Sequence, residues 1–456
     1  WSSDVCSSDL KNIATANQSL QQQVQKYQQL PKAHIGMVKN AYATGNTQLT
    51  KMADKVNQLS GTFQILPDFL GSDQPRTYAL MAMTTSEERS SGGLIGSVGV
   101  VTTDNGKISI GDFRSNGEYI PYGAGDPTED EQRIFQQWGP LNMSFDVRDL
   151  AVYPDTSRSA EGMRAIWQRT PWGSNTQLDG VLMVDPVFLQ ELTKISGNVT
   201  IPDGTVLTGD NTAEFLLNKV YVDYPVSMQD ALFAQVAEQT VGSMFSNVDL
   251  AKLTKVAQLM GSMAEGRHFS MYAFDETAEK TISDAGFTAQ TPSSEEHPQV
   301  GVYVTEQNPS KMGWYIHRTS KVTRSTCDND GSQTYHVEYT MTNTLESSQI
   351  GALTSYILGS GGQGVEKTLI YAPAGGSISN LKTSGGSVTE SRQETLNGKT
   401  VYASNATIAP GESVTYSFDV TTSTKAASDL TIDQTPMGWI DSGVTTDTAA
   451  CSINKQ

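Results

Sequence analysis

The sequence predicts an α+β protein with three parts in order. They are an N-terminal helical hairpin or stalk over residues 11–70, a three-layer α/β/α core with a mixed sheet over 71–312, and an antiparallel β-sandwich over 313–456. Three observations predict this class: helical apolar spacing in the first part, alternation of strand-like and helix-like segments in the second, and period-two alternation in the third. A chain of 456 residues is also too long for one compact core.

The first ten residues, WSSDVCSSDL, raise the question of whether they belong to the protein. Their codons resemble a common sequencing adapter read in frame, and the alternative is a short disordered arm. Under either interpretation we expect residues 1–10 to pack against nothing, with Trp1 exposed and Cys6 unpaired.

Residues 11–70 are predicted to be helical because apolar side chains recur at a and d spacing as far as Pro31. Those positions are Ile13, Ala16, Leu20, Tyr27 and Leu30. A hairpin or stalk that packs on the next domain is the simplest interpretation. A signalling coiled coil, the alternative, needs more heptads.

The core begins with the strand-like stretch RTYALMAM and continues through two β-rich runs that Asp104-Asn105-Gly106 separates. Because Asn and Gly tolerate positive φ, this triplet predicts a hairpin. DGVLMVDP, residues 179–186, predicts a buried strand, after which Asp185 and Pro186 suit the start of a helix that Gly197 ends. Further core strands are expected at 269–274 and 300–306.

The C-terminal part loses its helical signals from about residue 314. TYHVEYTMTN and SVTYSFDV place large apolar residues at every second position, and Asn397-Gly398 and Pro410-Gly411 supply turns. This pattern predicts an antiparallel β-sandwich.

Composition excludes some classes of function. The chain is 37% hydrophobic and 18% charged, with a net charge of −18, or −16 once Asp4 and Asp9 are left out. Such a balance argues against binding to nucleic-acid phosphates, and ordinary solubility explains the acidity most simply. There is no run of eighteen or more apolar residues that could span a membrane, so we expect any anchor helix to lie upstream of this sequence.

Cysteine usage fits an oxidising compartment. If Cys6 is set aside, the remaining two of the three cysteines are Cys327 and Cys451, close to the two ends of the sandwich. Outside the cytosol such a pair predicts one disulfide, which would stabilise the fold by about 4–5 kcal/mol in the chain-entropy model. The alternative is two unrelated buried thiols.

Several catalytic motifs fail in their context. GSGGQG at 359–364 precedes a strand rather than a helix, so no helix N-terminus could hold a pyrophosphate there. The five histidines are scattered without HExxH spacing, and there is no GxSxG elbow.

A polar constellation in the core remains as the candidate site. An arginine beside a glycine-containing turn can present a bidentate fork to phosphate, and carboxylates at strand ends can hold Mg²⁺ or act as bases. The alternative is that these side chains cap turns and form internal ion pairs. The candidate ligand-binding residues are Glu88, Arg89, Arg114, Asp155 and Arg158, and the candidate metal ligands are Asp112 and Asp185.

These segments, with LDGVLMVDPVFLQELTKISGNV, VYPDTSRSAEGMRAIW and AEGRHFSMYAF, resemble the family known as domain of unknown function DUF4012, found on large surface proteins of high-GC Gram-positive bacteria. The resemblance runs from about residue 70 to the C-terminus. It implies an N-terminal transmembrane helix, with this part of the chain outside the membrane. It implies no established reaction.

LDGVLMVDPVFLQELTKISGNV also resembles, more weakly, a strand and helix of the LytR–CpsA–Psr phosphotransferases, which transfer glycans from a polyprenyl-pyrophosphate carrier to the cell wall. That likeness implies that arginines bind a pyrophosphate and that acidic residues bind Mg²⁺. Arg89 is the candidate for one of these arginines here. The sequence departs from the family because residues 218–266 contain no arginine.

The sequence therefore predicts a membrane-anchored extracellular protein of the cell envelope of a Gram-positive bacterium. Its core would bind or process an envelope glycan or a polyprenyl-pyrophosphate-linked precursor, as a Mg²⁺-dependent phosphotransferase or pyrophosphatase. The alternative is a non-catalytic adhesion, assembly or sensor ectodomain, which the missing arginines favour. Neither interpretation involves nucleic acid.

Overall fold

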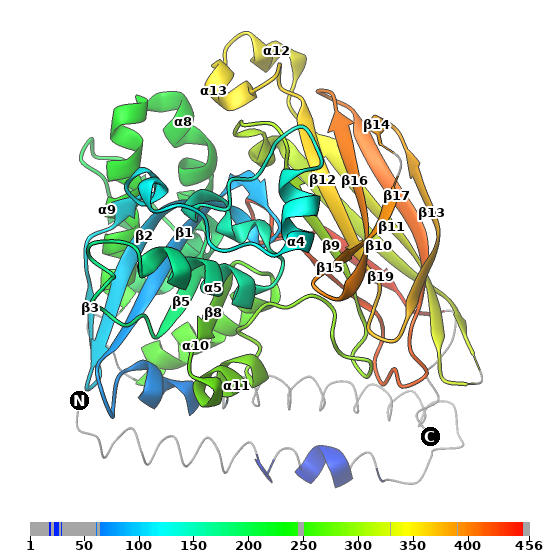
Figure 1. Cartoon of the computed structure of the whole chain (residues 1–456), viewed down its shortest axis with the longest axis horizontal. Helices are drawn as coiled ribbons and strands as arrows, with labels where there is room; N and C mark the ends of the chain where they lie inside the picture. The colour runs from blue at the N-terminus through cyan, green and yellow to red at the C-terminus, as the bar shows by residue number, and fades with distance from the viewer. Residues whose placement is uncertain are drawn as a thin grey trace.

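The computed structural model describes residues 18–19, 22–26, 29, 61, 64–244, 250–328, 330–389 and 391–449. The expectations for residues 1–10 and for most of the predicted helical hairpin lie outside these ranges. Within them, an α/β part and a β-sandwich lie side by side, which confirms the predicted α+β class (Figure 1). No helix among the described residues is both long and apolar enough to cross a membrane.

The α/β part is built on a mixed sheet whose strands run in the order β3-β2-β1-β5-β8, with β4 also paired to β2. β1 and β5 are parallel, whereas β2 and β8 are antiparallel to their neighbours β1 and β5. The strands are β1 (Arg76–Arg89), β2 (Gly92–Asp104), β3 (Lys107–Ile110), β4 (Arg114–Ser115), β5 (Gly180–Val184) and β8 (Phe269–Ala273).

The predicted hairpin joins β2 to β3. Asn105 and Gly106 have φ angles of 47° and 81°, the left-handed backbone that a two-residue turn of this kind requires. The predicted start of the helix after β5 is also confirmed, because the Asp185 side chain accepts a hydrogen bond from Phe188 N at 2.9 Å.

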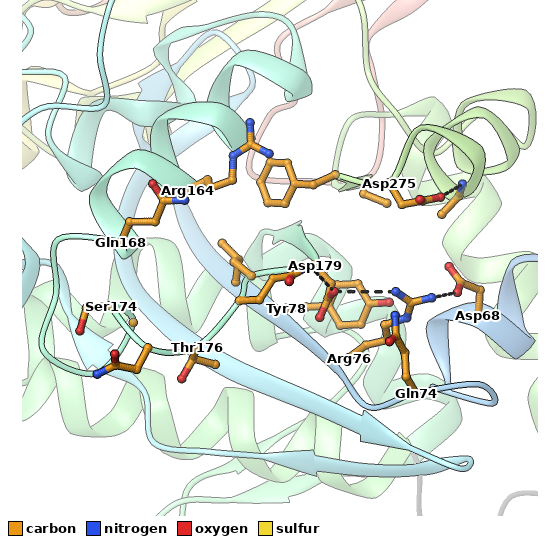
Figure 2. A pocket seen from close by; sticks show the side chains of 17 residues that line it. Asp68, Gln74, Arg76, Tyr78, Arg164, Gln168, Ser174, Thr176, Asp179 and Asp275 are labelled. Atoms are coloured by element: carbon orange, nitrogen blue, oxygen red, sulfur yellow. Dashed lines mark hydrogen bonds and ion pairs between the residues drawn. The ribbon is translucent and has the colours of Figure 1, made fainter.

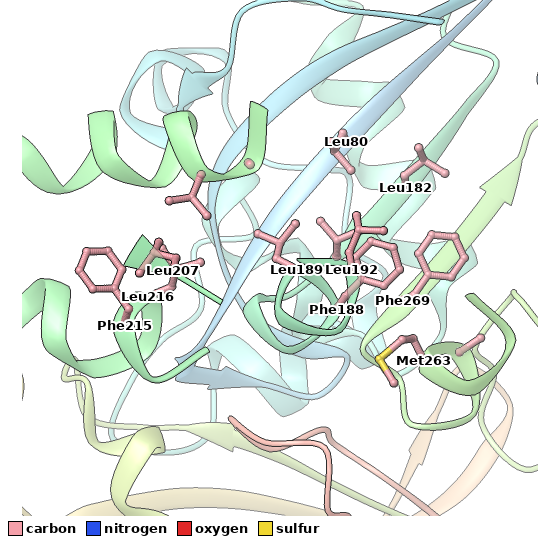
Figure 3. Close-up of a cluster of buried hydrophobic side chains, with 14 of the residues drawn as sticks. Leu80, Leu182, Phe188, Leu189, Leu192, Leu207, Phe215, Leu216, Met263 and Phe269 are labelled. Atoms are coloured by element: carbon pink, nitrogen blue, oxygen red, sulfur yellow. The ribbon is translucent and has the colours of Figure 1, made fainter. Parts of the chain in front are cut away.

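Alternate residues of β1 face two different helical layers, because successive side chains of a strand point to opposite faces. Leu80 packs with the layer of α6 (Pro186–Ser196), α9 (Val226–Met244) and α10 (Leu250–Glu265), part of which Figure 3 shows. Ala79 and Met81 pack with α5 (Thr156–Trp167) and the 3₁₀ helix η3 (Val147–Val152). The three-layer arrangement follows from this alternation.

The remaining helices of the α/β part are short or lie at its edges. They are α3 (Asn116–Tyr119), η1 (Ile120–Tyr122), α4 (Glu129–Glu131), η2 (Gln132–Gln136), α7 (Thr212–Glu214), η4 (Phe215–Lys219), α8 (Val220–Asp223) and α11 (Glu276–Asp284). A small separate ladder joins β6 (Val199–Thr200) to β7 (Val206–Leu207).

The sandwich consists of two sheets. One has the order β13-β17-β11-β10-β19, and the other has the order β14-β16-β12-β9-β18, with β15 paired to β16. The strands of the first sheet are β13 (Ser377–Ser384), β17 (Ser413–Thr421), β11 (Gln333–Asn343), β10 (Ile316–Cys327) and β19 (Val444–Asp447). Those of the second are β14 (Ser387–Val388), β15 (Arg392–Leu396), β16 (Lys399–Ile408), β12 (Gly364–Tyr371), β9 (Gln299–Glu306) and β18 (Thr431–Gln434).

The predicted inward-facing residues of β11 and β17 form the sandwich core, with Tyr339 and Tyr416 fully buried. The sandwich differs from a purely antiparallel one because β19 and β18 pair in parallel with β10 and β9. Three short helices, η5 (Met312–Tyr315), α12 (Ser347–Ile350) and α13 (Ser355–Leu358), connect its strands.

Strand β9 differs most from the sequence prediction, which placed residues 300–306 in the α/β core. It pairs with β12 in the sandwich. The physical reason is that both of its faces are covered: Val302 and Val304 enter the sandwich core, whereas Tyr303 packs into the α/β core. A strand buried on both faces shows no alternation that could assign it to either part.

Candidate functional site

The predicted site residues Glu88 and Arg89 lie at the carboxyl end of β1, where it meets the sandwich. Their exposed fractions are 0% and 5%. Arg89 donates from Nε and Nη2 to Asp149 Oδ1 at 3.0 and 2.8 Å, and Glu88 Oε1 lies 3.0 Å from Arg318 Nη2. Both side chains are therefore engaged in internal ion pairs.

The other three predicted ligand-binding residues also bind parts of the chain to one another. Arg158 donates to Glu131 at 2.7 and 2.9 Å and pairs with Glu161. Asp155 accepts hydrogen bonds from the backbone and the hydroxyl of Thr291 at 2.6 and 3.0 Å.

Arg114 pairs with Glu118 at 3.1 Å, and its guanidinium carbon lies 4.4 Å from the centre of the Trp172 ring. Because Arg114 is only partly buried, we expect this pair to contribute little to stability. Each of the predicted arginines is thus paired with a carboxylate of the chain, and no two of them are available together to bind a pyrophosphate.

The two predicted metal ligands lie apart. Asp185 caps α6 and lies 2.6 Å from Nδ1 of buried His268, whereas Asp112 is exposed in the loop between β3 and β4. Across the described ranges there is no group of three or more His, Cys, Asp or Glu side chains that could hold a metal ion. The structure therefore shows no set of ligands for the predicted Mg²⁺ among these residues.

The disulfide between Cys327 and Cys451 stays a prediction, because Cys451 lies beyond the residues that the structure describes.

A cluster of buried carboxyl groups lies where the two parts of the molecule meet. Glu88, Glu306 and Glu366 are each at most 2% exposed, and Glu306 and Glu366 are direct partners on neighbouring strands. Burial raises the pKa of Glu88 to about 7, although Arg318 opposes this. Burial also raises the pKa of Glu306 and of Glu366 well above the ordinary range, and for Glu366 the repulsion from Glu88 and Glu306 adds to it.

A cavity of about 700 Å³, which we call the polar cavity, lies at the opposite end of the sheet. It opens where β1 and β5 begin and β8 ends, so its wall residue Arg76 is separated from Arg89 by the length of β1, on the order of 40 Å. None of the predicted site residues lines it, although Arg158 lines a smaller neighbouring cavity. Figure 2 shows Arg164 and Gln168 of α5 on one side, opposite Tyr78 and Arg76 of β1.

One wall of the polar cavity is fixed by ion pairs. Asp179 accepts a hydrogen bond from Thr77 N at 2.7 Å, and its other oxygen lies 3.8 Å from Arg76 Nη1. Arg76 also pairs with Asp68, in the short helical segment before β1. This wall is preorganised, because the strand backbone and two carboxylates fix the position of the arginine.

The other wall presents polar groups with unused hydrogen-bonding capacity. The Arg164 guanidinium stacks 4.1 Å from the centre of the Phe274 ring and donates no hydrogen bond to any described residue. The amides of Gln168 and Asn175 are exposed and line the same cavity. Amides, carboxylates and a guanidinium around an aromatic ring can bind vicinal hydroxyl groups in pairs while the ring contacts C–H groups.

None of the candidate site residues predicted from the sequence belongs to these walls, and Asp179 was predicted only as the first residue of the stretch 179–186. A weak signal was present, because the loop GSNTQLD between α5 and β5 is rich in amides and hydroxyls. Nothing in the sequence places that loop beside the start of β1 and the end of β8.

Comparison with known proteins gives a family but no activity. Residues 73–221 match the family described as "Protein of unknown function (DUF4012)", which confirms the family resemblance over these residues. From residue 222 to the C-terminus the resemblance stays a prediction. No curated protein matches the chain. A solved structure of a "putative nutrient binding protein" from Legionella pneumophila matches with 11% identity and a TM-score of 0.17, over 28% of this chain and 43% of that one. That similarity is too slight to inform fold or function. Neither match is to a LytR–CpsA–Psr phosphotransferase, so that likeness stays a prediction.

Proposed function

We propose that this chain, which carries a DUF4012 domain over residues 73–221, is an extracellular cell-envelope protein that binds an envelope glycan in the polar cavity without catalysing a reaction on it. The anchor in the membrane and the Gram-positive envelope come from the family resemblance. The binding site comes from the geometry of the cavity.

The observation that carries this proposal is the chemistry of the cavity wall. Four primary amides line it, those of Gln74, Gln168, Asn175 and Gln177, together with the hydroxyls of Ser174 and Thr176. Each amide both donates and accepts hydrogen bonds, as a sugar hydroxyl does, so the wall can match a dense array of hydroxyls. The cavity volume of about 700 Å³ also falls in the range of small-molecule sites.

The charges of the cavity favour a neutral glycan over a pyrophosphate. Three carboxylates, those of Asp68, Asp179 and Asp275, outnumber the guanidiniums of Arg76 and Arg164. Arg76 is already paired with two of the carboxylates. A dianionic ligand would therefore meet net negative charge, which raises the free energy of binding.

The internal pairing of Arg89 and Arg158 supports binding rather than phosphoryl transfer. An arginine that stabilises a transition state must be available to the developing charge. Arg89 is 5% exposed and donates both of its paired hydrogen bonds to Asp149. We therefore expect no Mg²⁺-dependent hydrolysis of a polyprenyl-pyrophosphate analogue. Turnover that Arg89→Ala abolishes in a folded protein would contradict this expectation.

Binding is tested by titrating the purified chain with cell-wall polysaccharide extracted from a high-GC Gram-positive bacterium. Calorimetry is expected to show saturable binding that Asn175→Ala weakens by about tenfold, the loss of roughly one hydrogen bond to a ligand in a desolvated site. Gln137→Ala removes another exposed amide, which does not line this cavity, so it serves as the matched control. Equal affinity of the two variants would exclude the polar cavity as the site.

A further inference from the structure

Two smaller cavities adjoin the polar cavity and share walls with it. One, of about 270 Å³, has Asp68, Tyr78 and Asp275 in common with the polar cavity. The other, of about 320 Å³, has Arg164 and Gln168 in common with it. Because the polar cavity shares wall residues with each of the other two, which share none with each other, the three cavities lie in a row with the polar cavity in the middle. We call this row of cavities the groove.

The groove extends along one face of α5. Arg158, Glu161, Ala165 and Gln168 line the 320 Å³ cavity, and their spacing of three and four residues places them on one side of the helix. The distance from the first to the last is about 15 Å at the helical rise of 1.5 Å per residue. This part of the groove alone is longer than a single sugar ring.

The two ends of the groove differ in polarity. The 270 Å³ cavity, which we call the apolar cavity, is lined by Ile65, Phe69, Met271 and Ile282. The 320 Å³ cavity, which we call the cavity along α5, is lined by Asp126, Arg158 and Glu161. A ligand that fills the groove therefore meets apolar surface at one end and charged groups at the other. Such asymmetry gives a chain-like ligand one preferred direction.

We propose that the groove binds a linear polysaccharide, with at least three consecutive sugar units lying in the apolar cavity, the polar cavity and the cavity along α5. This inference rests on the proposed function and adds to it that the ligand is a polymer recognised along its length. Arg164 and Gln168, in the wall between two cavities, contact adjacent units.

The charge of the groove disfavours linear polymers that are anionic. Five carboxylates and three guanidiniums line the groove, so a polyanion such as a nucleic acid or a polyphosphate is disfavoured. A neutral polysaccharide is compatible with both signs of charge, because its hydroxyls accept hydrogen bonds from guanidiniums and donate to carboxylates.

The test measures how affinity depends on ligand length. The extracted cell-wall polysaccharide is partly hydrolysed and separated by size, and each fraction is titrated into the full chain. We expect affinity to rise by at least about tenfold from monosaccharide to trisaccharide fractions and then to level off once the groove is filled.

Variants along the groove sharpen the test. Gln64 lies in the wall of the apolar cavity, and Glu161 lies in the wall of the cavity along α5. Because both side chains are at least partly exposed, we expect the variants Gln64→Ala and Glu161→Ala to fold. Each is expected to weaken the long fractions more than the short ones, whereas Asn175→Ala weakens all fractions. Gln137→Ala, outside the three cavities, again serves as the control.

The outcomes separate this inference from the proposed function. If monosaccharide fractions bind as tightly as long ones, or if Gln64→Ala and Glu161→Ala affect all lengths equally, the polymer groove is wrong while glycan binding stands. If neither the intact polysaccharide nor any fraction binds, both proposals fail.

Discussion

Among single residues, Arg89 differs most between the role that the sequence predicts and the role that the structure shows. Beside a glycine-containing turn it suits a phosphate ligand, yet in the fold it is buried and paired with Asp149. Burial opposes ionisation of Asp149, but Arg89 and the hydrogen bonds from Ser144 outweigh it and lower the pKa of this carboxyl. Arg89 is therefore a structural residue that joins β1 to η3.

Replacement of Arg89 tests this structural role. Arg89→Ala leaves Asp149 buried without its cation, so the free energy of unfolding should fall by about 3 kcal/mol or more in urea titrations. Arg114→Ala is the control, because Arg114 is only partly buried and its loss should cost less than about 1 kcal/mol. Equal effects of the two substitutions would contradict the assignment.

Glu366 offers a test of the buried carboxyl cluster. Neither of its carboxyl oxygens has a hydrogen-bond partner among the described residues, and its pKa is raised in the folded state by burial and by Glu88 and Glu306. A carboxyl whose folded pKa lies above its unfolded pKa binds more protons when folded. Its stabilising contribution is therefore lost as pH rises from the unfolded pKa toward the folded one.

We expect the chain to unfold at a lower temperature at pH 7.0 than at pH 5.5, since Glu88, Glu306 and Glu366 shift in the same direction. Glu366→Gln mimics the protonated carboxyl, so it should raise stability at pH 7.0 by about 1–2 kcal/mol and reduce the slope between the two pH values. Exposed Glu338→Gln should leave both unchanged. A steeper slope in Glu366→Gln would contradict this explanation.

At the scale of elements, the sequence predicted correctly the features that depend on residues adjacent in the chain, such as a turn and the start of a helix. The turn at Asn105-Gly106 and the start of α6 at Asp185 depend on residues adjacent in sequence, and both were predicted. The place of β9 depends on the residues that cover its two faces, and these residues are distant from β9 in the sequence. The same limit applies to the internal pairing of the candidate site residues, because Arg318, the partner of Glu88, carries no sequence signal that links it to β1.

The start of α6 can be tested directly. Asp185→Ala removes the acceptor for Phe188 N and the partner of His268, so stability should fall by about 1–2 kcal/mol in chemical denaturation. Asp185→Asn keeps an N-cap acceptor and should lose less. If Asp185 were instead a metal ligand, Mg²⁺ would stabilise the wild type and neither variant.

At the scale of the whole molecule, the α/β part and the sandwich share a core. Tyr303 and Leu369 of the second sandwich sheet pack in the same hydrophobic cluster as Met81 and Met183 of the mixed sheet. Arg267 pairs with Asp433 across the same boundary, and both groups are largely buried. Domains that share a hydrophobic core are not expected to move independently.

We therefore expect the two parts to unfold together. Scanning calorimetry of the chain should show a single cooperative transition, in which the calorimetric enthalpy equals the van't Hoff enthalpy. Tyr303→Ala should lower that one transition, because it opens a cavity in the shared core. Two separate transitions in the wild type, with only one affected by the substitution, would show that the parts fold independently.

The function that we propose depends on the polar cavity at the amino ends of β1 and β5, because its wall is rich in amides and its charge disfavours an anionic ligand. The most direct test is calorimetric titration of the wild-type chain and of Asn175→Ala with extracted cell-wall polysaccharide. We expect saturable binding by the wild type that Asn175→Ala weakens by about tenfold while Gln137→Ala does not. No binding by the wild type, or equal binding by all three proteins, would contradict the proposed function.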